Sequence, residues 1–185
     1  MLVYRTVCPI VAHFYRCNEL NFDHLMLIRP VATDDITLLS EFWYDNMALL
    51  QQTNPRVRLL PTARAEWEAF ATRSIADATV IFLAAEDDAS ADVLGCIHAM
   101  PTANAVGLAP ARIGRVGQIV LDIHSPHKQR RTGHHLWQAV KSTFAEMAIT
   151  HVRIEATLTA PVMQAFWRGV GAVPTDNIFW ITLDS

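Results

Sequence analysis

The sequence predicts an α/β domain, and three observations carry this prediction. The chain has 185 residues, which suits one domain with a substantial buried core. Hydrophobic residues make up 51% of it and charged residues 18%, a balance typical of globular proteins. Apolar residues recur at strand or helix spacing along most of the chain, in the order β-α-α-β-β-β-α-β-α-β. We therefore expect strands and helices to alternate around one core.

In the first half, residues that end strands or start helices mark the bounds of the predicted elements. A strand ends at Pro30, and Thr33 with the two aspartates after it is typical of a helix start. A polar turn at 86–91 separates two β-branched, apolar runs, which predicts a hairpin. The predicted elements are a strand at 25–29, a helix at 33–50, a helix at 63–75, strands at 79–85 and 93–100, and a loop at 101–112.

The second half is more strongly patterned. Leu136, Val140 and Phe144 recur at helical spacing, Pro161 suits a first helical turn, and Gly171 suits a helix end. The predicted elements are a central strand at 116–124, a polar loop at 125–132, a helix at 133–148, a strand at 152–156, a helix at 161–170 and a strand at 178–183.

Residues 1–25 fit neither a signal peptide nor a transit peptide, because Pro9 and His13 break their apolar stretch. A strand-like segment begins at Met26. Our hypothesis is therefore an N-terminal extension over 1–25, followed by a single domain over 26–185.

Charge and cysteine usage exclude several classes of protein. The net charge of −3 argues against a dedicated nucleic-acid binder. The three cysteines match neither a zinc motif nor a closed set of disulfides, so we expect a reduced, cytoplasmic setting. No apolar run approaches the roughly 18 residues that a membrane span needs. We expect no metal, because no carboxylate or cysteine lies at ligand spacing from His134 and His135.

A basic segment, Lys128 to His135, lies between the predicted central strand and the following helix. The first N–H groups of a helix have no partner within it, and the helix dipole favours negative charge there. Gly133 permits close approach to the backbone. The segment therefore predicts a pyrophosphate site, with a solvated surface run as the alternative.

Three segments resemble the GNAT superfamily of N-acetyltransferases. They are the opening strand and helix start at 28–35, the strand and basic loop at 120–136, and the late segment Ala165-Phe166-Trp167-Arg168-Gly169-Val170-Gly171-Ala172. The resemblance spans most of residues 26–183. It implies a mixed, mostly antiparallel central sheet of six to seven strands flanked by about four helices.

The resemblance also implies acetyl-CoA as co-substrate. The family loop reads Arg/Gln-x-x-Gly-x-Gly/Ala. One register places Arg130 first with Gly133 as the first glycine. The preferred register places Lys128 first, Arg131 at the first glycine and Gly133 at the second, which keeps the apolar face of the helix intact. The implied coenzyme-binding residues are Leu121, Ile123, Lys128, Gln129, Arg130, Arg131, Thr132, Gly133, His134 and Trp167.

The proton-transfer positions of the family are altered in this chain. Its usual glutamate matches Gln118, and its usual tyrosine matches Trp167, neither of which exchanges a proton at neutral pH. Asp122 and His124 are further catalytic candidates, since alternation along the predicted strand puts them on one face with Gln118. Each also has a purely structural interpretation, as a turn-capping carboxylate and a solvated strand end.

The leading function is therefore transfer of an acetyl group from acetyl-CoA to a primary amine. Acidic and aromatic residues on the first two predicted helices suit a cationic amine, and we expect a small molecule rather than a protein as acceptor. The alternative is a catalytically impaired acyl-CoA-binding or sensory domain. A nucleic-acid module built on 128–131 is a third hypothesis, disfavoured by the acidic balance. The oligomeric state stays open, a homodimer included.

Overall fold

A computed structural model describes residues 26–157 and 160–176, with the side chains of 126–128 left out. The proposed extension over 1–25 and the predicted strand at 178–183 lie outside these residues. The chain forms two compact units, Met1–Glu155 and Ala156–Ser185, which we describe separately. None of the helices in the described residues combines the length and apolarity needed to cross a membrane.

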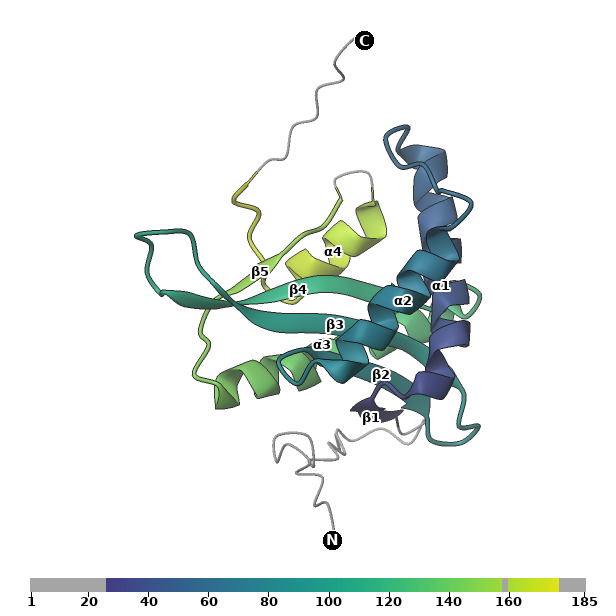
Figure 1. The fold of residues 1–185 in the computed structure, drawn as a ribbon, viewed down its shortest axis with the longest axis horizontal. Coiled ribbons are helices and arrows are strands. Elements are labelled where there is room, and N and C mark those ends of the chain that lie inside the picture. Colours follow the sequence, from purple (N-terminus) through teal and green to yellow (C-terminus); the bar gives the residue numbers. More distant parts are fainter. Residues whose placement is uncertain (1–25, 158–159, 177–185) are drawn as a thin grey trace, which may run out of the picture. The chain divides into compact units, whose positions relative to one another are not determined.

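The first unit is built on a five-stranded sheet in the order β1-β2-β3-β4-β5 (Figure 1). The first four strands pair antiparallel, and β5 pairs parallel with β4. The strands are β1 (Met26–Pro30), β2 (Ile81–Asp87), β3 (Val93–Ala103), β4 (Arg112–Leu121) and β5 (Val152–Ile154). The predicted fold class is confirmed, with five strands in the described residues where six to seven were expected.

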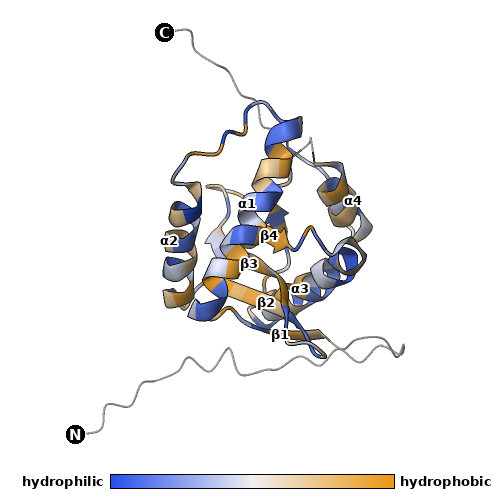
Figure 2. Cartoon of the chain, turned by 90° about the vertical axis from the view of Figure 1, so that its right-hand side faces the viewer, coloured by the Kyte–Doolittle hydropathy of each residue, from blue (hydrophilic) through white to orange (hydrophobic). Residues whose placement is uncertain are grey.

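Helices cover both faces of this sheet (Figures 1 and 2). They are α1 (Ile36–Thr53), entered through a short 3-10 turn at Thr33–Asp35, α2 (Ala63–Ala76) and α3 (Pro126–Glu146). One core lies between the sheet and the pair α1 and α2, where Leu39, Trp67 and Ala71 pack against apolar strand residues. On the other face, Phe144 of α3 lies over Gly114 of β4; a Cβ there would come within 2.6 Å of the Phe144 ring.

The predicted boundaries of β4 are wrong at both ends. The strand runs from Arg112 to Leu121, where 116–124 was predicted. Its start is earlier because β3 continues to Ala103, which pairs with Arg112, so the predicted loop at 101–112 shrinks to 104–111. It ends earlier because the carboxylate of Asp122 accepts a hydrogen bond from the His124 N–H, which turns the chain.

The predicted start of α3 is also wrong. The helix begins at Pro126, whereas the sequence predicted a loop at 125–132 and a helix from Gly133. Proline suits the first turn because its missing N–H would have no partner there. Lysine, glutamine and arginine favour helices, and Arg131 stands where a glycine would have weakened one. Gly133 consequently lies about two turns inside the helix.

Arg29 ties β1 to the entrance of α1 and to β2. Its two terminal nitrogens donate to the carboxylate of Asp35 at 2.7 and 2.9 Å, and its Nε donates to Glu86 at 2.6 Å. Asp35 also accepts from the N–H of Ala32 at 2.7 Å. Burial raises the pKa of Asp35, but the hydrogen bonds from Arg29 and Ala32 outweigh it and hold that pKa below its usual value.

The second unit contains one described helix, α4 (Pro161–Gly169), which confirms the helix predicted at 161–170. Pro161 occupies its first turn. Gly171, just beyond the helix, has a φ of +94°, a conformation that glycine adopts without strain. The ring of Trp167 is buried and lies edge-on to Phe166, with centroids 4.9 Å apart.

Candidate functional site

Strand β4 has a backbone edge that the sheet leaves uncovered. Its pairing with β5 ends at Val116 and Ile154, while β4 itself continues to Leu121. On that side, no strand in the described ranges pairs with residues 117–121. Peptide groups on such an edge can hydrogen-bond an extended ligand, as a peptide does in strand addition.

A bulge lies at the start of this uncovered edge. His98 of β3 pairs with Gln118, and the next residue, Ala99, pairs with Val116, so Gly117 is the extra residue. The His98 ring lies against Gly117; a Cβ on that glycine would come within 3.1 Å of Nδ1. The absence of a side chain at Gly117 therefore gives the imidazole its place beneath the strand.

Gln118 faces α2 in this arrangement. The indole N–H of Trp67 donates to its Oε1 at 2.9 Å. The amide oxygen is thus already engaged, and its nitrogen is the group left to hold a ligand or a water. Gln118 lies on the uncovered edge of β4, as expected of a site residue, and its catalytic role stays a prediction.

Asp122 and His124 do not share a strand face with Gln118, so that prediction is wrong. Both follow the end of β4. The Asp122 carboxylate caps the turn through the His124 N–H, and its carbonyl oxygen accepts from the Gln129 side chain at 2.9 Å. The His124 ring is exposed, with Nε2 3.1 Å from a carboxylate oxygen of Asp45 in α1. These contacts fit the structural interpretations, since they join the turn to α1 and α3.

The remaining predicted coenzyme-binding residues of this unit follow the uncovered edge in the chain. Leu121 ends β4, and its carbonyl oxygen accepts from the side chain of Asn46 at 2.8 Å; Ile123 is half-buried in the turn. Lys128 lies in the first turn of α3, although its side chain is not described.

The rest of the basic segment divides between the two sides of α3. Arg130, Arg131 and His134 are exposed, whereas Thr132 and Gly133 are buried. The structure therefore presents the two arginine side chains and the His134 ring on one side of the first turns of α3, and Gly133 on the buried side. Trp167, the last predicted coenzyme-binding residue, belongs to the second unit and was described with it.

His98 was not among the site residues predicted from the sequence. Its side chain is 6% exposed, and neither ring nitrogen has a hydrogen-bond partner among the described residues. Phe70 and Phe82 pack against the ring, with centroids 4.9 and 5.6 Å away. Burial lowers the pKa of His98, and the positive charge of Arg115 acts in the same direction, so the imidazole is neutral at pH 7. The available signal was one ionisable residue at an inward position of an apolar strand.

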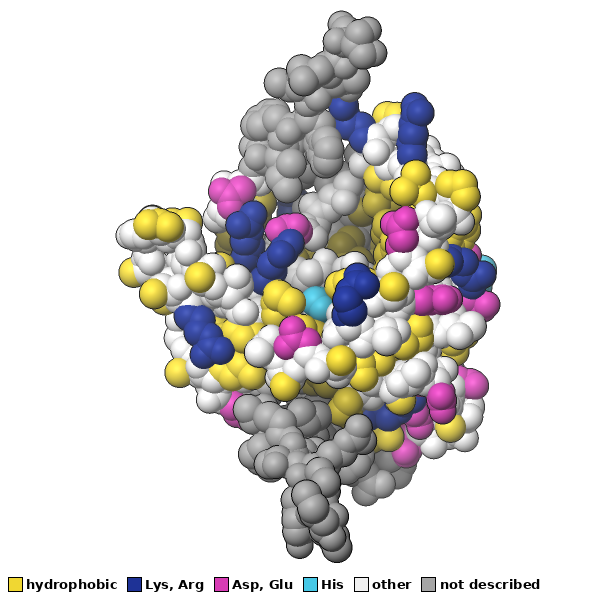
Figure 3. Space-filling model, viewed as in Figure 1, with side chains coloured by type: hydrophobic (Ala, Val, Ile, Leu, Met, Phe, Trp, Pro, Cys, Tyr) yellow, Lys and Arg dark blue, Asp and Glu magenta, His cyan; other side chains and the backbone are white. Residues whose placement is uncertain are grey.

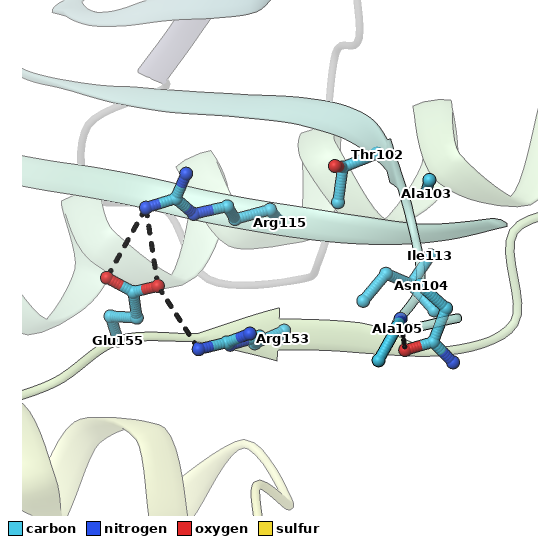
Figure 4. A pocket seen from close by; sticks show the side chains of 8 residues that line it. All are labelled: Thr102, Ala103, Asn104, Ala105, Ile113, Arg115, Arg153 and Glu155. Carbon is cyan, nitrogen blue, oxygen red and sulfur yellow. Dashed lines mark hydrogen bonds and ion pairs between the residues drawn. The ribbon is translucent and has the colours of Figure 1, made fainter. Parts of the chain in front are cut away.

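Two arginines at the open end of the sheet were also missed. Arg115 of β4 and Arg153 of β5 are register partners, and both contact the carboxylate of Glu155, at 3.3 and 3.7 Å. They line a pocket of about 300 Å³ (Figure 4). In the figure Arg115 and Glu155 point toward one another, and Thr102 and Asn104 lie on the far side of the pocket. Spacing alone could not find this cluster, because the parallel register of β5 creates it.

The acidic and aromatic side chains of α1 and α2 all have partners within the described residues. The Trp43 and Trp67 rings stack with centroids 6.1 Å apart, and Trp67 is buried. The carboxylate partners are Arg64 for Glu41, His124 for Asp45, Thr62 for Glu66 and Ser40 for Glu68. Within residues 26–157 and 160–176, no three histidine, cysteine, aspartate or glutamate side chains gather as a metal site would require.

Comparison with known proteins identifies the fold. No family model matches the sequence, and no curated protein matches it. Among solved structures, a GCN5-related N-acetyltransferase from Ralstonia eutropha JMP134 is 20% identical, covers 85% of this chain and 98% of its own, and has a TM-score of 0.60. A predicted acetyltransferase with acetyl-CoA from Clostridium acetobutylicum is 16% identical, with coverages of 86% and 96% and a TM-score of 0.59.

A third similar structure is AAC(6')-Iy in complex with the bisubstrate analog CoA-S-monomethyl-acetylneamine. It is 16% identical, with coverages of 86% and 99% and a TM-score of 0.60. These likenesses show that the chain has the fold of the GCN5-related, or GNAT, N-acetyltransferases, as the sequence resemblance implied.

Proposed function

We propose that this chain, which has the GNAT fold, transfers an acetyl group from acetyl-CoA to a primary amine. The observation that carries the proposal is the uncovered edge of β4, residues 117–121, which leads directly to the N-terminus of α3. The pantetheine arm of coenzyme A is extended and carries two amides. It can therefore pair with this edge as a short additional strand. The solved structures of the same fold with acetyl-CoA and with a coenzyme A conjugate support this choice of ligand.

The pyrophosphate in this proposal lies at the first turns of α3. The N–H groups of residues 127 and 128 precede the helical hydrogen-bond ladder, and the helix dipole favours an anion there. Arg130 and Arg131 add exposed positive charge. Because Gly133 is inside the helix, we assign the phosphate contacts to the first-turn N–H groups and to cationic side chains.

The reaction requires one proton to leave the amine and one to reach sulfur. The neutral amine nitrogen attacks the thioester carbonyl carbon, the C–S bond breaks, and the amine proton passes to a base while the thiolate takes a proton to become the coenzyme thiol. We assign the base to His98, because it is neutral at pH 7 and lies under the bulge that begins the uncovered edge. Its nitrogens are covered, so it acts through a water molecule, which the Gln118 amide nitrogen can orient.

The proposal is tested by measuring acetyl-CoA binding and thiol release with the full chain. Calorimetry is expected to show one acetyl-CoA site, and release of free thiol is expected to depend on an added primary amine. Absence of binding at millimolar acetyl-CoA would refute the proposal.

Reversing the charge of Arg130 and Arg131 together is expected to weaken acetyl-CoA binding at least tenfold. The two substitutions remove charges placed beside the pyrophosphate and introduce repulsion. The dissociation constant of R130E/R131E is to be compared with that of R58E, which changes an exposed arginine between α1 and α2. Equal affinity for the double variant and the wild type would show that the pyrophosphate lies elsewhere.

A catalytically impaired acyl-CoA-binding domain is the second candidate, and Gln118 in place of a proton-accepting side chain favours it. Amine-dependent thiol release would dismiss it, while acetyl-CoA binding without release over a broad panel of amines would support it. On the face drawn in Figure 3, acidic and basic side chains intermingle, which does not favour the nucleic-acid hypothesis.

A further inference from the structure

The pocket beside Arg115 and Arg153 points to the chemical class of the acceptor. We infer that this pocket binds a carboxylate on the acceptor, so that the preferred substrate is an amine that also carries an acidic group. The inference rests on the proposed function, because it identifies the substrate of that same site.

The pocket lies on the same face of the sheet as His98 and Gln118. Side chains alternate along a strand, and paired residues point to the same side. His98 and Gln118 face α2, since their partners are Phe70 and Trp67. Two residues further along β3 is Met100, which pairs with Arg115, and then Thr102, which pairs with Ile113. Arg115, Thr102 and Ile113 therefore continue the face on which the base lies.

The charge of the pocket is positive. Of the described residues that line it, Arg115, Arg153 and Glu155 are charged, which leaves an excess of one positive charge. The ion-pair distances of 3.3 and 3.7 Å are long for charge-assisted hydrogen bonds, which are typically about 2.8 Å. One carboxylate cannot engage all five N–H donors of each guanidinium. Arg115 and Arg153 already contact the carboxylate of Glu155, and N–H donors of both guanidinium groups remain for a second carboxylate.

The position of the pocket sets the separation between acid and amine. Gln118 and Arg115 pair with His98 and Met100, which are two residues apart on β3, or about 7 Å at the rise of an extended strand, because the bulge at Gly117 takes up the extra residue of β4. An arginine side chain leans several ångströms from its Cα, so an amine about five or six carbons from its carboxylate would span the gap. A volume of about 300 Å³ is at the lower end for small-molecule sites and suits such a chain.

The partners of the acidic side chains on α1 and α2 agree with this assignment. A polycationic acceptor would need unengaged carboxylates near the base. Glu41 contacts Arg64, and Asp45 contacts His124. Glu66 and Glu68 of α2 accept hydrogen bonds from the hydroxyls of Thr62 and Ser40, while Arg115 and Arg153 supply the positive charge on the base-bearing face.

Three amines that differ only in their far end test the inference: 6-aminohexanoate, hexylamine and 1,6-diaminohexane. In thiol-release assays with saturating acetyl-CoA, 6-aminohexanoate is expected to have a kcat/KM at least tenfold above that of either other amine. R115E is expected to abolish this preference through KM, R115K to retain most of it, and R58E to leave it unchanged. The KM for acetyl-CoA should be the same in all four proteins.

The outcomes separate this inference from the proposed function. Equal kcat/KM for the three amines, or an undiminished preference in R115E, overturns the inference and leaves acetyl transfer standing. If thiol is released with none of the amines, the proposed acetyl transfer is wrong. Calorimetry with hexanoate then tests whether the pocket binds a carboxylate. Hexanoate binding that R115E abolishes and R58E preserves supports a carboxylate site, whereas absence of hexanoate binding overturns it.

Discussion

Replacing Arg29 by methionine is expected to lower the free energy of unfolding by about 3–5 kcal/mol at pH 7, because it leaves a buried carboxylate without its partner. Arg29 donates two hydrogen bonds to Asp35, whose side chain is 9% exposed, and a third to Glu86. Methionine replaces the stem of the arginine and none of its donors. Urea denaturation measures the loss. The matched control is R64M, whose ion pair with Glu41 is exposed and is expected to cost less than about 1 kcal/mol.

The pH dependence of this effect has a definite sign. The folded-state pKa of Asp35 lies below its unfolded value, so the unfolded chain binds more protons as the pH falls from about 5. The stabilisation from Arg29 is thus fully present above that range and is lost as the pH falls through the folded pKa. The unfolding free energies of R29M and the wild type should converge at acid pH. A loss below about 1 kcal/mol at pH 7 would contradict this view of Arg29.

The elements that the sequence predicted well are those whose pattern is local. Helix α1 has a recognisable start and apolar residues at helical spacing, α2 is rich in residues that favour helices, and α4 has a proline in its first turn; the observed bounds of all three lie close to the predicted ones. The hairpin of β2 and β3 was predicted from β-branched runs on either side of a polar turn. Such signals depend on neighbours in the chain, so they survive without knowledge of the tertiary structure.

The elements predicted poorly are those that a distant segment determines. The sequence predicted a loop up to Arg112, from its alanine, proline and glycine residues, and a strand only from Val116, so the strand segment Arg112 to Arg115 was missed. Its strand conformation comes from pairing with the far end of β3, and Gly114 is needed because Phe144 of α3 lies over it. The early start of α3 was missed for another reason: residues 125–132 are polar and basic and the apolar spacing begins only at Leu136, while the residues present favour a helix.

Only part of the candidate site could be predicted from the sequence, for the same reason. Gln118 could be found because it matches the position of the family's usual glutamate. His98, Arg115 and Arg153 come together with it through the bulge at Gly117 and the register of β5, and neither leaves a signal in one sequence. The sequence shows a histidine at an inward position of an apolar strand. It does not show that the ring nitrogens of His98 lack hydrogen-bond partners among the described residues.

Replacing His98 by leucine is expected to stabilise the fold and to impair the reaction. A buried polar group without a hydrogen bond costs about 1–3 kcal/mol, and leucine of similar volume removes that cost. We expect a gain of about 1 kcal/mol in the free energy of unfolding at pH 7, after some loss of contact with Phe70 and Phe82. The same substitution removes the proposed base, so kcat/KM is expected to fall by about 100-fold or more.

The pH dependence distinguishes a base from a packing residue. Burial depresses the folded pKa of His98, so below about pH 6.5 the unfolded chain takes up a proton that the folded chain does not. The wild type should therefore lose stability relative to H98L as the pH falls below 6.5, by at most about 1.4 kcal/mol per pH unit.

The wild-type kcat/KM should fall on its acidic limb through the folded pKa of His98, and H98L should lack that inflection. If H98L gains stability but keeps the wild-type pH–rate profile, His98 is a core residue and the proton leaves the amine by another route. Loss of both activity and the inflection in a more stable protein would show that the fold retains this unpaired imidazole for its chemistry and not for its stability.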